Sequence, residues 1–424
     1  MNHASVIVES QGVRLITDPW LEGTVFNAGW TLLSPTRLRY EDFANITHIW
    51  FSHEHPDHFT PPNLRRIPAE YRRRIKVLFH ETRDKRVINV CKELGFETQE
   101  LPEGEKVSLA PDFNLVSGCQ SLLDSWIAIF AEGKTILNMN DCDFPDQDDL
   151  VKIKTRIGRV DVLLSQFSYA SWVGNPDDLA TQKMHAERKL AEMQRQIRLF
   201  QPSWFIPFAS FIYFSHAENC FMNNSVNRIG DVYKYTSAEL KTPTLILYPG
   251  DRWCVGEPWD SSASIRNYES DFARALAITP EESAIVPLTT LQQAANAFLE
   301  KNRARNNRFL LLMLPPSVVR IRDLNLDVEL SYRRGLRQVI GKQPDILTSS
   351  DSLMYCLKFD WGGNTLGING RYEVPKDGQP ERFFRLFRVP EYNIAGQALN
   401  FHLLGSRLIQ SVRRAFVSLT VLSL

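Results

Sequence analysis

Eight residues, from Phe51 to His58, restrict the fold of this chain more than any other segment. They read FSHEHPDH and follow a short apolar run, Thr47–Phe51, that has the length of a buried β-strand. Three imidazoles and a carboxylate within six residues cannot share one face of a helix, and they have little reason to meet in an apolar core. Imidazole and carboxylate groups together bind zinc, iron, manganese or nickel. The segment therefore predicts a metal-binding loop at the end of a strand, and the alternative is a solvated polar loop.

Short β-like runs and helices alternate through the first 200 residues. The expected strands are residues 5–9, 13–17, 47–51, 76–79, 114–116, 126–130, 135–138 and 161–165, and the expected helices are Glu81–Leu94 and Asp177–Phe200. The longer helix carries an apolar stripe at helical spacing and is followed by Pro202. This alternation predicts an α/β sandwich with a mixed sheet rather than an all-β barrel.

The length of the chain predicts a second domain. A chain of 424 residues is too long for one ordinary core, and the composition changes after Pro258. We expect a first domain over residues 1–265 and a smaller α+β domain over 266–424. The elements expected in the second part are a helix over Glu281–Arg305, a strand over Phe309–Leu314, a hairpin over Asp351–Val374 and an amphipathic helix over Gln397–Leu419.

The charge balance limits the partners. Lys+Arg and Asp+Glu are both 49, so no overall field would attract the chain to nucleic acid or to an anionic membrane. No apolar run is long enough for a transmembrane helix, no signal peptide is evident, and the six cysteines form no C-x-x-C pairs. These features predict a cytoplasmic protein without a nucleic-acid partner or a transmembrane segment.

The order H-x-H-x-D-H after a strand resembles the signature of the metallo-β-lactamase superfamily. The resemblance extends to Asp18 in LITDPW, to Asp141 in MNDCD and to His216 in PFASFIYFSHAEN, and so covers roughly residues 1–255. The motifs are most similar to a branch that includes L-ascorbate-6-phosphate lactonase, N-acylphosphatidylethanolamine phospholipase D and the non-Rieske part of CMP-N-acetylneuraminate hydroxylase. The resemblance implies the αββα sandwich of the superfamily.

The resemblance also implies a dinuclear metal site. His53 and His55 would hold the first metal, Asp57, His58 and His216 would hold the second, and Asp141 would bridge the two. The metals would be two divalent ions, zinc by preference, with iron and manganese as alternatives. Asp143 competes with Asp141 for the bridging position.

One expected ligand is missing from the sequence. The superfamily supplies a further histidine to the first metal, but residues 109–135 contain none. Cys119, in the corresponding stretch, is either a replacement ligand or a small buried residue. His80 is a candidate for a supporting or substrate-binding role. The basic run from Arg65 to Lys76 would suit an anionic substrate, and otherwise it is a solvated face.

Two kinds of reaction fit this ligand set. The first is hydrolysis of a phosphoester, lactone or amide by a metal-bridging hydroxide, with Asp57 orienting it or moving a proton. The alternative is a non-haem diiron oxygenase that resembles the catalytic part of CMP-N-acetylneuraminate hydroxylase and takes electrons from a separate protein. No C-x-H…C-x-x-H pair of the Rieske kind occurs in this sequence, so hydrolysis of a small molecule, possibly an anionic one, is preferred.

Overall fold

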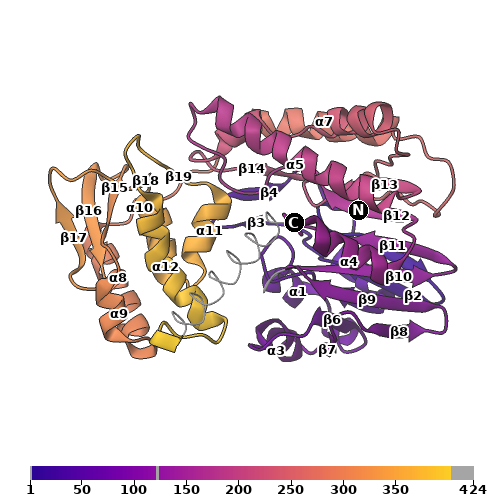
Figure 1. Ribbon diagram of the computed structural model, residues 1–424, viewed down its shortest axis with the longest axis horizontal. Helices are drawn as coiled ribbons and strands as arrows, with labels where there is room; N and C mark the ends of the chain where they lie inside the picture. The colour runs from indigo at the N-terminus through magenta and orange to yellow at the C-terminus, as the bar shows by residue number, and fades with distance from the viewer. Residues whose placement is uncertain (1, 121–123, 403–424) are drawn as a thin grey trace, which may run out of the picture. The chain divides into compact units, whose positions relative to one another are not determined.

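The computed structural model of the protein describes residues 2–120 and 124–402 (Figure 1). Backbone contacts divide the chain into two compact units, Met1–Glu281 and Glu282–Leu424. The boundary expected at residue 265 lies inside helix α7 (Ser262–Ala277), which belongs to the first unit. Each unit is described separately below.

Two sheets form the centre of the first unit. In spatial order, the first contains β1 (Ile7–Ser10), β2 (Val13–Thr17), β5 (His48–Trp50), β6 (Lys76–His80) and β7 (Glu97–Leu101). The second contains β13 (Trp204–Phe208), β12 (Val162–Gln166), β11 (Lys134–Asn138), β10 (Ser125–Ala131), β9 (Phe113–Cys119) and β8 (Lys106–Ala110). Strands β2, β5, β6 and β7 are parallel, as are β11, β12 and β13.

The two sheets pack face to face through alternate residues of their strands. Leu15, Trp50 and Leu78 of the first sheet share one buried cluster with Leu115 and Ile127 of the second. Because side chains alternate between the two faces of a strand, the neighbouring residues point to the outer faces. The inner apolar layer therefore fixes the register of β5, the strand that precedes the FSHEHPDH segment.

Helices cover both outer faces. Helices α1 (Pro61–Arg66) and α3 (Arg86–Glu93) contribute Leu64 and Ile88 to the cluster on the first sheet. On the other side, α4 (Gln147–Ile157) and α5 (Leu179–Phe200) contribute Ile153, Met193 and other residues to the cluster on the second sheet (Figure 1). The αββα sandwich predicted from the sequence is confirmed.

The remaining elements of the first unit are short. They are β3 (Thr24–Val25), β4 (Trp30–Leu32) and β14 (Ile212–Phe214), which form a small third sheet, with η1 (Tyr40–Asn45), α2 (Ala69–Arg72), η2 (Cys220–Asn224), α6 (Ile229–Lys234) and η3 (Tyr235–Glu239).

The second unit is the α+β domain that the sequence predicts. Its sheet has the order β17 (Gly335–Val339), β16 (Leu326–Ser331), β15 (Ser317–Ile321), β18 (Ile346–Thr348) and β19 (Tyr372–Glu373). Its helices are α8 (Leu288–Arg305), α9 (Arg308–Met313), α10 (Ser350–Lys358), α11 (Gly362–Asn369) and α12 (Pro380–Ile394).

Two sequence predictions in this unit are wrong. The strand expected over Phe309–Leu314 is helix α9, because the Asn307 side chain caps it by accepting hydrogen bonds from the backbone N–H groups of Phe309 and Leu310. The hairpin expected over Asp351–Val374 is the helix pair α10 and α11. The predicted helix Gln397–Leu419 lies mostly outside the described residues.

Glycines 362 and 363 allow this helix pair to pack and do not form a hairpin turn. A Cβ on Gly362 would lie 2.4 Å from the Cα of Cys356, and one on Gly363 would lie 2.4 Å from the Cβ of Phe387. The missing side chains therefore allow α11 to approach α10 and α12 closely. Throughout the described residues, no helix is both long and apolar enough to cross a bilayer.

Candidate metal centre

The FSHEHPDH segment leaves the carboxyl end of β5 and returns its side chains to the edge of the sandwich. His53, Asp57 and His58 are at most 1% exposed, whereas His55 is half-buried. Glu54 points to Arg86 and forms an ion pair with it at 2.6 Å. Of the residues that follow β5, His53, His55, Asp57 and His58 thus form the cluster. Glu54 lies in a separate ion pair.

The first set of ligand atoms surrounds His58. Its Nε2 lies 3.2 Å from Asp57 Oδ2 and 3.3 Å from Asp141 Oδ2. Asp141 follows β11, so the second sheet meets the metal loop here. Ligands about 2.1 Å from a tetrahedral zinc are separated by about 3.4 Å. His58 Nε2 therefore lies at ligand-to-ligand spacing from each of the two carboxylates.

The second set contains His53 and His55, whose Nε2 and Nδ1 atoms are 2.8 Å apart. A carboxylate oxygen of Asp124, Oδ1, lies 4.0 Å from His53 Nε2. Asp124 immediately precedes β10, in the region where the resemblance implies a histidine that the sequence does not contain. Asp124 was not predicted from the sequence, because an isolated aspartate beside a loop carries no distinguishing pattern.

Neighbouring polar groups orient the imidazoles. Asp18 Oδ2 lies 3.1 Å from His58 Nδ1, and Asp18 Oδ1 accepts a hydrogen bond from the backbone N–H of Ser52. The Ser52 hydroxyl lies 2.9 Å from His53 Nδ1. Metal-binding histidines usually have such a partner on the ring nitrogen that does not bind the metal. This pattern leaves Nε2 of both His53 and His58 for a metal.

His3 is a further member of the cluster, and the sequence analysis did not identify it. The residue is 2% exposed, and its Nε2 lies 3.1 Å from Asp57 Oδ2. Three groups of side chains have ligand atoms close enough to hold a metal ion: His3, Asp57 and His58; His53, His58 and Asp141; and His53, His55 and Asp57. His3 is an isolated histidine, and it approaches the metal loop only because the strand that follows it pairs with β2, which leads to Asp18.

Four residues in the left-handed backbone region surround the cluster. They are His3, Asp18, Asn140 and Ala209, with φ values of 47°, 37°, 50° and 47°. Each such conformation costs about 1–3 kcal/mol for a residue other than glycine. Asn140 donates a hydrogen bond to Asp18, and the Ala209 N–H donates to the carbonyl of His3. The fold holds several strained turns where the site residues meet.

Burial and mutual charge set the protonation of the cluster. Burial lowers the pKa of His53 well below its usual value, and the nearby His58 and His55 lower it further. For His58, burial is outweighed by Asp57, Asp141 and Asp18, and the pKa lies well above the usual value. Burial is likewise outweighed at Asp57, where His58 and His3 hold the pKa well below its usual range. Before a metal binds, Asp57 and His58 therefore form a carboxylate–imidazolium pair.

Several buried atoms have no hydrogen-bond partner in the described part of the chain. They include Asp57 Oδ1, His58 Nε2 and Asp141 Oδ1. Leaving such a group unsatisfied costs about 1–3 kcal/mol, and more when it is charged. A divalent cation between these side chains would give His58 Nε2 a partner and compensate the charge of both carboxylates, so the residues present fit a metal ion.

Other residues considered from the sequence lie in different surroundings. His216 follows β14, is 2% exposed, and accepts a hydrogen bond at Nδ1 from the backbone N–H of Glu218; it is outside the three groups identified above. Asp143, the competitor of Asp141 for the bridging position, faces Arg188, whose Nη2 lies 3.5 Å from Asp143 Oδ2. Burial raises the pKa of the Cys119 thiol to about 11, with Glu103 and Asp124 adding to the effect.

His80 and the basic run differ from each other in burial. His80 is 3% exposed, burial lowers its pKa to about 4, and neither ring nitrogen has a hydrogen-bond partner among the described residues. In the basic run, Arg66 pairs with Glu22 and lies over the ring of Tyr40, and Arg73 and Arg74 are exposed. Part of this positive charge is therefore neutralised locally.

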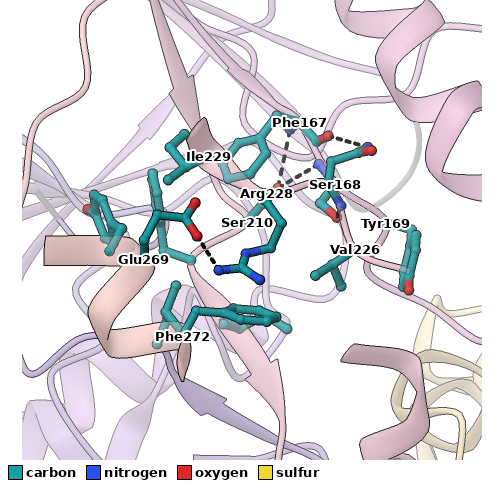
Figure 2. Close-up of a pocket in the computed structure, with 14 residues that line it drawn as sticks. Phe167, Ser168, Tyr169, Ser210, Val226, Arg228, Ile229, Glu269 and Phe272 are labelled. Carbon is teal, nitrogen blue, oxygen red and sulfur yellow. Dashed lines mark hydrogen bonds and ion pairs between the residues drawn. The ribbon is translucent and has the colours of Figure 1, made fainter. Parts of the chain in front are cut away.

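A pocket lies beyond the ends of β12 and β13 (Figure 2). The Ser210 hydroxyl accepts hydrogen bonds from the backbone N–H groups of Phe167 and Ser168. Arg228 forms an ion pair with Glu269 and lies 3.9 Å over the ring of Phe272. The lining is therefore aromatic, with hydroxyl groups and a neutralised charge pair, and it contains none of the predicted metal ligands.

Comparison with known proteins gives one family match. Residues 1–114 match the family model described as the beta-lactamase superfamily domain. Cytidine monophosphate-N-acetylneuraminic acid hydroxylase from Mus musculus is 26% identical over 290 residues, which are 61% of this chain and 49% of that protein. The chain spans about half the length of the curated relatives it matches.

Two solved structures have similar regions. CmlA, a diiron β-hydroxylase from Streptomyces venezuelae, is 18% identical with a TM-score of 0.37, over 49% of this chain and 43% of that chain. The metallo-β-lactamase fold protein YhfI from Bacillus subtilis is 12% identical with a TM-score of 0.38, over 59% of this chain and 91% of that chain.

Proposed function

This chain belongs to the metallo-β-lactamase superfamily, and from this premise we propose that it is a two-metal hydrolase of a small-molecule phosphoester, lactone or amide. The observation that carries the proposal is the position of His58, whose Nε2 faces carboxylate oxygens of Asp57 and Asp141 at 3.2 and 3.3 Å. Each of these side chains has a buried atom without a hydrogen-bond partner in the described residues, and all three are chemically suited to a divalent ion. Hydrolysis needs no further protein group.

The proposed ligands divide between two ions. His58, Asp57 and Asp141 would hold the second ion, and we retain His216 as the further ligand that the family resemblance implies. His53 and His55 would hold the first ion, with Asp141 between the two. Asp124 is the described carboxylate nearest to His53, at 4.0 Å, and we propose that it completes the first ion's ligands in place of the absent histidine.

When bound, two divalent ions lower the pKa of water and polarise a substrate oxygen. The chain's own contribution begins with Asp57, whose Oδ1 is buried and without a hydrogen-bond partner in the described residues. This oxygen would orient the attacking water and accept its proton.

A second reaction class has specific support. The relatives that match over about 60% of this chain are named as CMP-N-acetylneuraminic acid hydroxylases. The same histidines and carboxylates suit two iron ions, and hydroxylation would need dioxygen and electrons from a separate protein. We propose this diiron oxygenase as the alternative to hydrolysis.

One experiment separates the two classes. The protein is purified without added metal, its metal content is measured, and turnover of phosphodiester and lactone panels is assayed under anaerobic conditions. Hydrolysis predicts about two ions per chain and turnover without dioxygen. Strict dependence on dioxygen and a reductant, with iron as the sole supporting metal, would establish the oxygenase instead.

A further inference from the structure

We propose that His3 is a positioning residue at the metal centre. It holds the Asp57 carboxylate by donating a hydrogen bond from Nε2–H to Oδ2. The inference rests on the proposed metal site, because it concerns how one of its ligands is oriented. The two atoms are 3.1 Å apart, and both side chains are buried. Neither the sequence motifs nor the family match assigns this role to His3.

The backbone around His3 is fixed from several directions. The carbonyl of His3 accepts a hydrogen bond from the Ala209 N–H at 3.1 Å. Asn2 and Ser5 exchange two backbone hydrogen bonds, at 2.9 and 2.8 Å, which close the turn around His3. His3 itself has a φ of 47°, a conformation in which a side chain is placed where an extended backbone would not place it. The first strand thus begins with a turn that points an imidazole at the metal loop.

Neighbouring rings fix the orientation of the imidazole. The His3 ring lies edge-on to Trp20 and to His58, with centroids 5.8 and 5.5 Å away. Trp20 is itself 1% exposed. The ring of His3 is therefore confined, and its Nε2 remains directed at Asp57.

His3 Nε2 lies close enough to Asp57 and His58 to be a metal ligand itself. The surroundings of His3 Nδ1 indicate instead that Nε2 is a hydrogen-bond donor. Histidines that bind metals nearly always donate their second N–H to an acceptor. His58 has Asp18 at Nδ1, and His53 has the Ser52 hydroxyl. His3 Nδ1 has no such partner among residues 2–120 and 124–402. With Nε2 protonated, Nδ1 carries no hydrogen that would need an acceptor.

The hydrogen bond would stop the Asp57 carboxylate from rotating. A carboxylate oxygen has two lone pairs, so Oδ2 can accept from His3 and still face His58 Nε2 at 3.2 Å. Asp57 Oδ1 then points in a fixed direction, and both of its lone pairs remain available. Without His3, the carboxylate could turn, and the ligand would have to be ordered each time a metal binds.

The test compares His3→Phe, which removes the donor, with His3→Gln, whose amide N–H can replace Nε2–H. Cobalt(II) is titrated into the metal-free full chain and followed by its visible absorption. We expect His3→Phe to weaken the site around Asp57 and His58 about 10–100-fold, the range typical for the loss of a partner that orients a ligand. We expect His3→Gln to recover most of this loss. His48→Phe is the matched control, because His48 lies on the same sheet and bonds to Thr47.

A second measurement needs no folded variant. Nitrogen-15 NMR of the zinc-loaded wild-type protein reads the protonation of each imidazole, and correlations between backbone and side-chain nuclei assign the His3 signals. A proton on Nε2 of His3 is the expected result. A metal-bound Nε2 with the proton on Nδ1, or equal metal affinity in His3→Phe and the wild type, would overturn the inference. Absence of any metal binding by the wild type would instead overturn the proposed function.

Discussion

The two halves of the candidate metal centre differ in how completely the fold supports them. Around His58, ligand atoms lie 3.2 and 3.3 Å away, and Asp18 holds the opposite ring nitrogen. Around His53 and His55, the further carboxylate is 4.0 Å away, and His55 is half-buried. The half around His58 has its ligands in place before a metal binds, whereas the half around His53 and His55 is more open.

This difference has a chemical consequence. The ligands around His58 already lie at ligand-to-ligand spacing, whereas Asp124 must approach His53 before it can complete the first ion, which leaves a more open position there for water or substrate. The half around His58 should therefore bind its metal more tightly, and the half around His53 should contact the reacting group. Each prediction below changes one half and leaves the other in place.

The largest effect is expected from His58→Ala. This change removes the atom that contacts both Asp57 and Asp141, and it leaves the buried carboxylate of Asp18 without its imidazole. We expect loss of the tighter ion, loss of activity and a decrease in stability of about 3–5 kcal/mol, the usual result of breaking a buried ion pair. Metal counting and thermal unfolding measure these changes.

His402→Ala is the control for His58→Ala, because His402 is exposed. It should retain two ions and an unchanged unfolding temperature. A His58→Ala protein that still holds two ions would contradict the assignment of the tighter half.

The next prediction compares the two halves directly. His53→Ala should remove the weaker ion and most activity, whereas His216→Ala should weaken the tighter ion, as the family resemblance implies. A chelator titration of the wild type should release one ion well before the other. Simultaneous release of both ions, or an unchanged metal count in His53→Ala, would show that the two halves are assigned wrongly.

Within both halves, the loop residues and the isolated residues differ in how far the sequence identifies them as candidates. The metal loop was predictable because its ligands are adjacent in sequence and follow a recognisable strand. Asp124 and His3 are isolated residues, and only the folded backbone brings them to the loop. Local spacing contains no information about such contacts.

The same limit explains the errors in the second unit. The segment with Trp361 and two glycines has the composition of a turn, yet the glycines are needed for close packing against Cys356 and Phe387. Phe309–Leu314 is apolar enough for a strand, and the Asn307 cap decides in favour of a helix. In the first unit, alternation and turn residues agreed with the tertiary structure, and the sandwich was predicted correctly.

A smaller effect is expected at Asp124. Asp124→Ala should weaken the first ion about 10–100-fold and leave the second unchanged, because it removes a ligand or a close partner of His53 alone. Asp124→His would supply the histidine that the family resemblance implies, and it should restore binding. Cobalt(II) titration measures both variants, with Asp143→Ala as a nearby acidic control. An unchanged first site in Asp124→Ala would leave that ion's fourth ligand to another residue, such as Cys119.

The smallest effect concerns pH. Because Asp57, Asp141 and Asp18 outweigh burial and raise the pKa of His58, a metal at the tighter half must displace a proton. Its affinity should rise with pH, by up to about tenfold per unit, until the raised pKa is passed. His53 has a lowered pKa, mainly because of burial, and is already neutral at pH 7, so it adds no such dependence to the weaker half.

The stability of the metal-free protein should follow the opposite trend. A histidine whose pKa is raised in the folded state stabilises that state fully below its unfolded pKa of about 6.5, and the contribution is lost as pH rises through the folded value. Metal-free protein should therefore become less stable above neutral pH while the tighter ion binds more strongly. Thermal unfolding between pH 6 and 9, with and without zinc, measures both trends. Parallel pH dependence of the two ions would remove the electrostatic distinction between the halves, because it would mean that His58 carries no proton for the metal to displace.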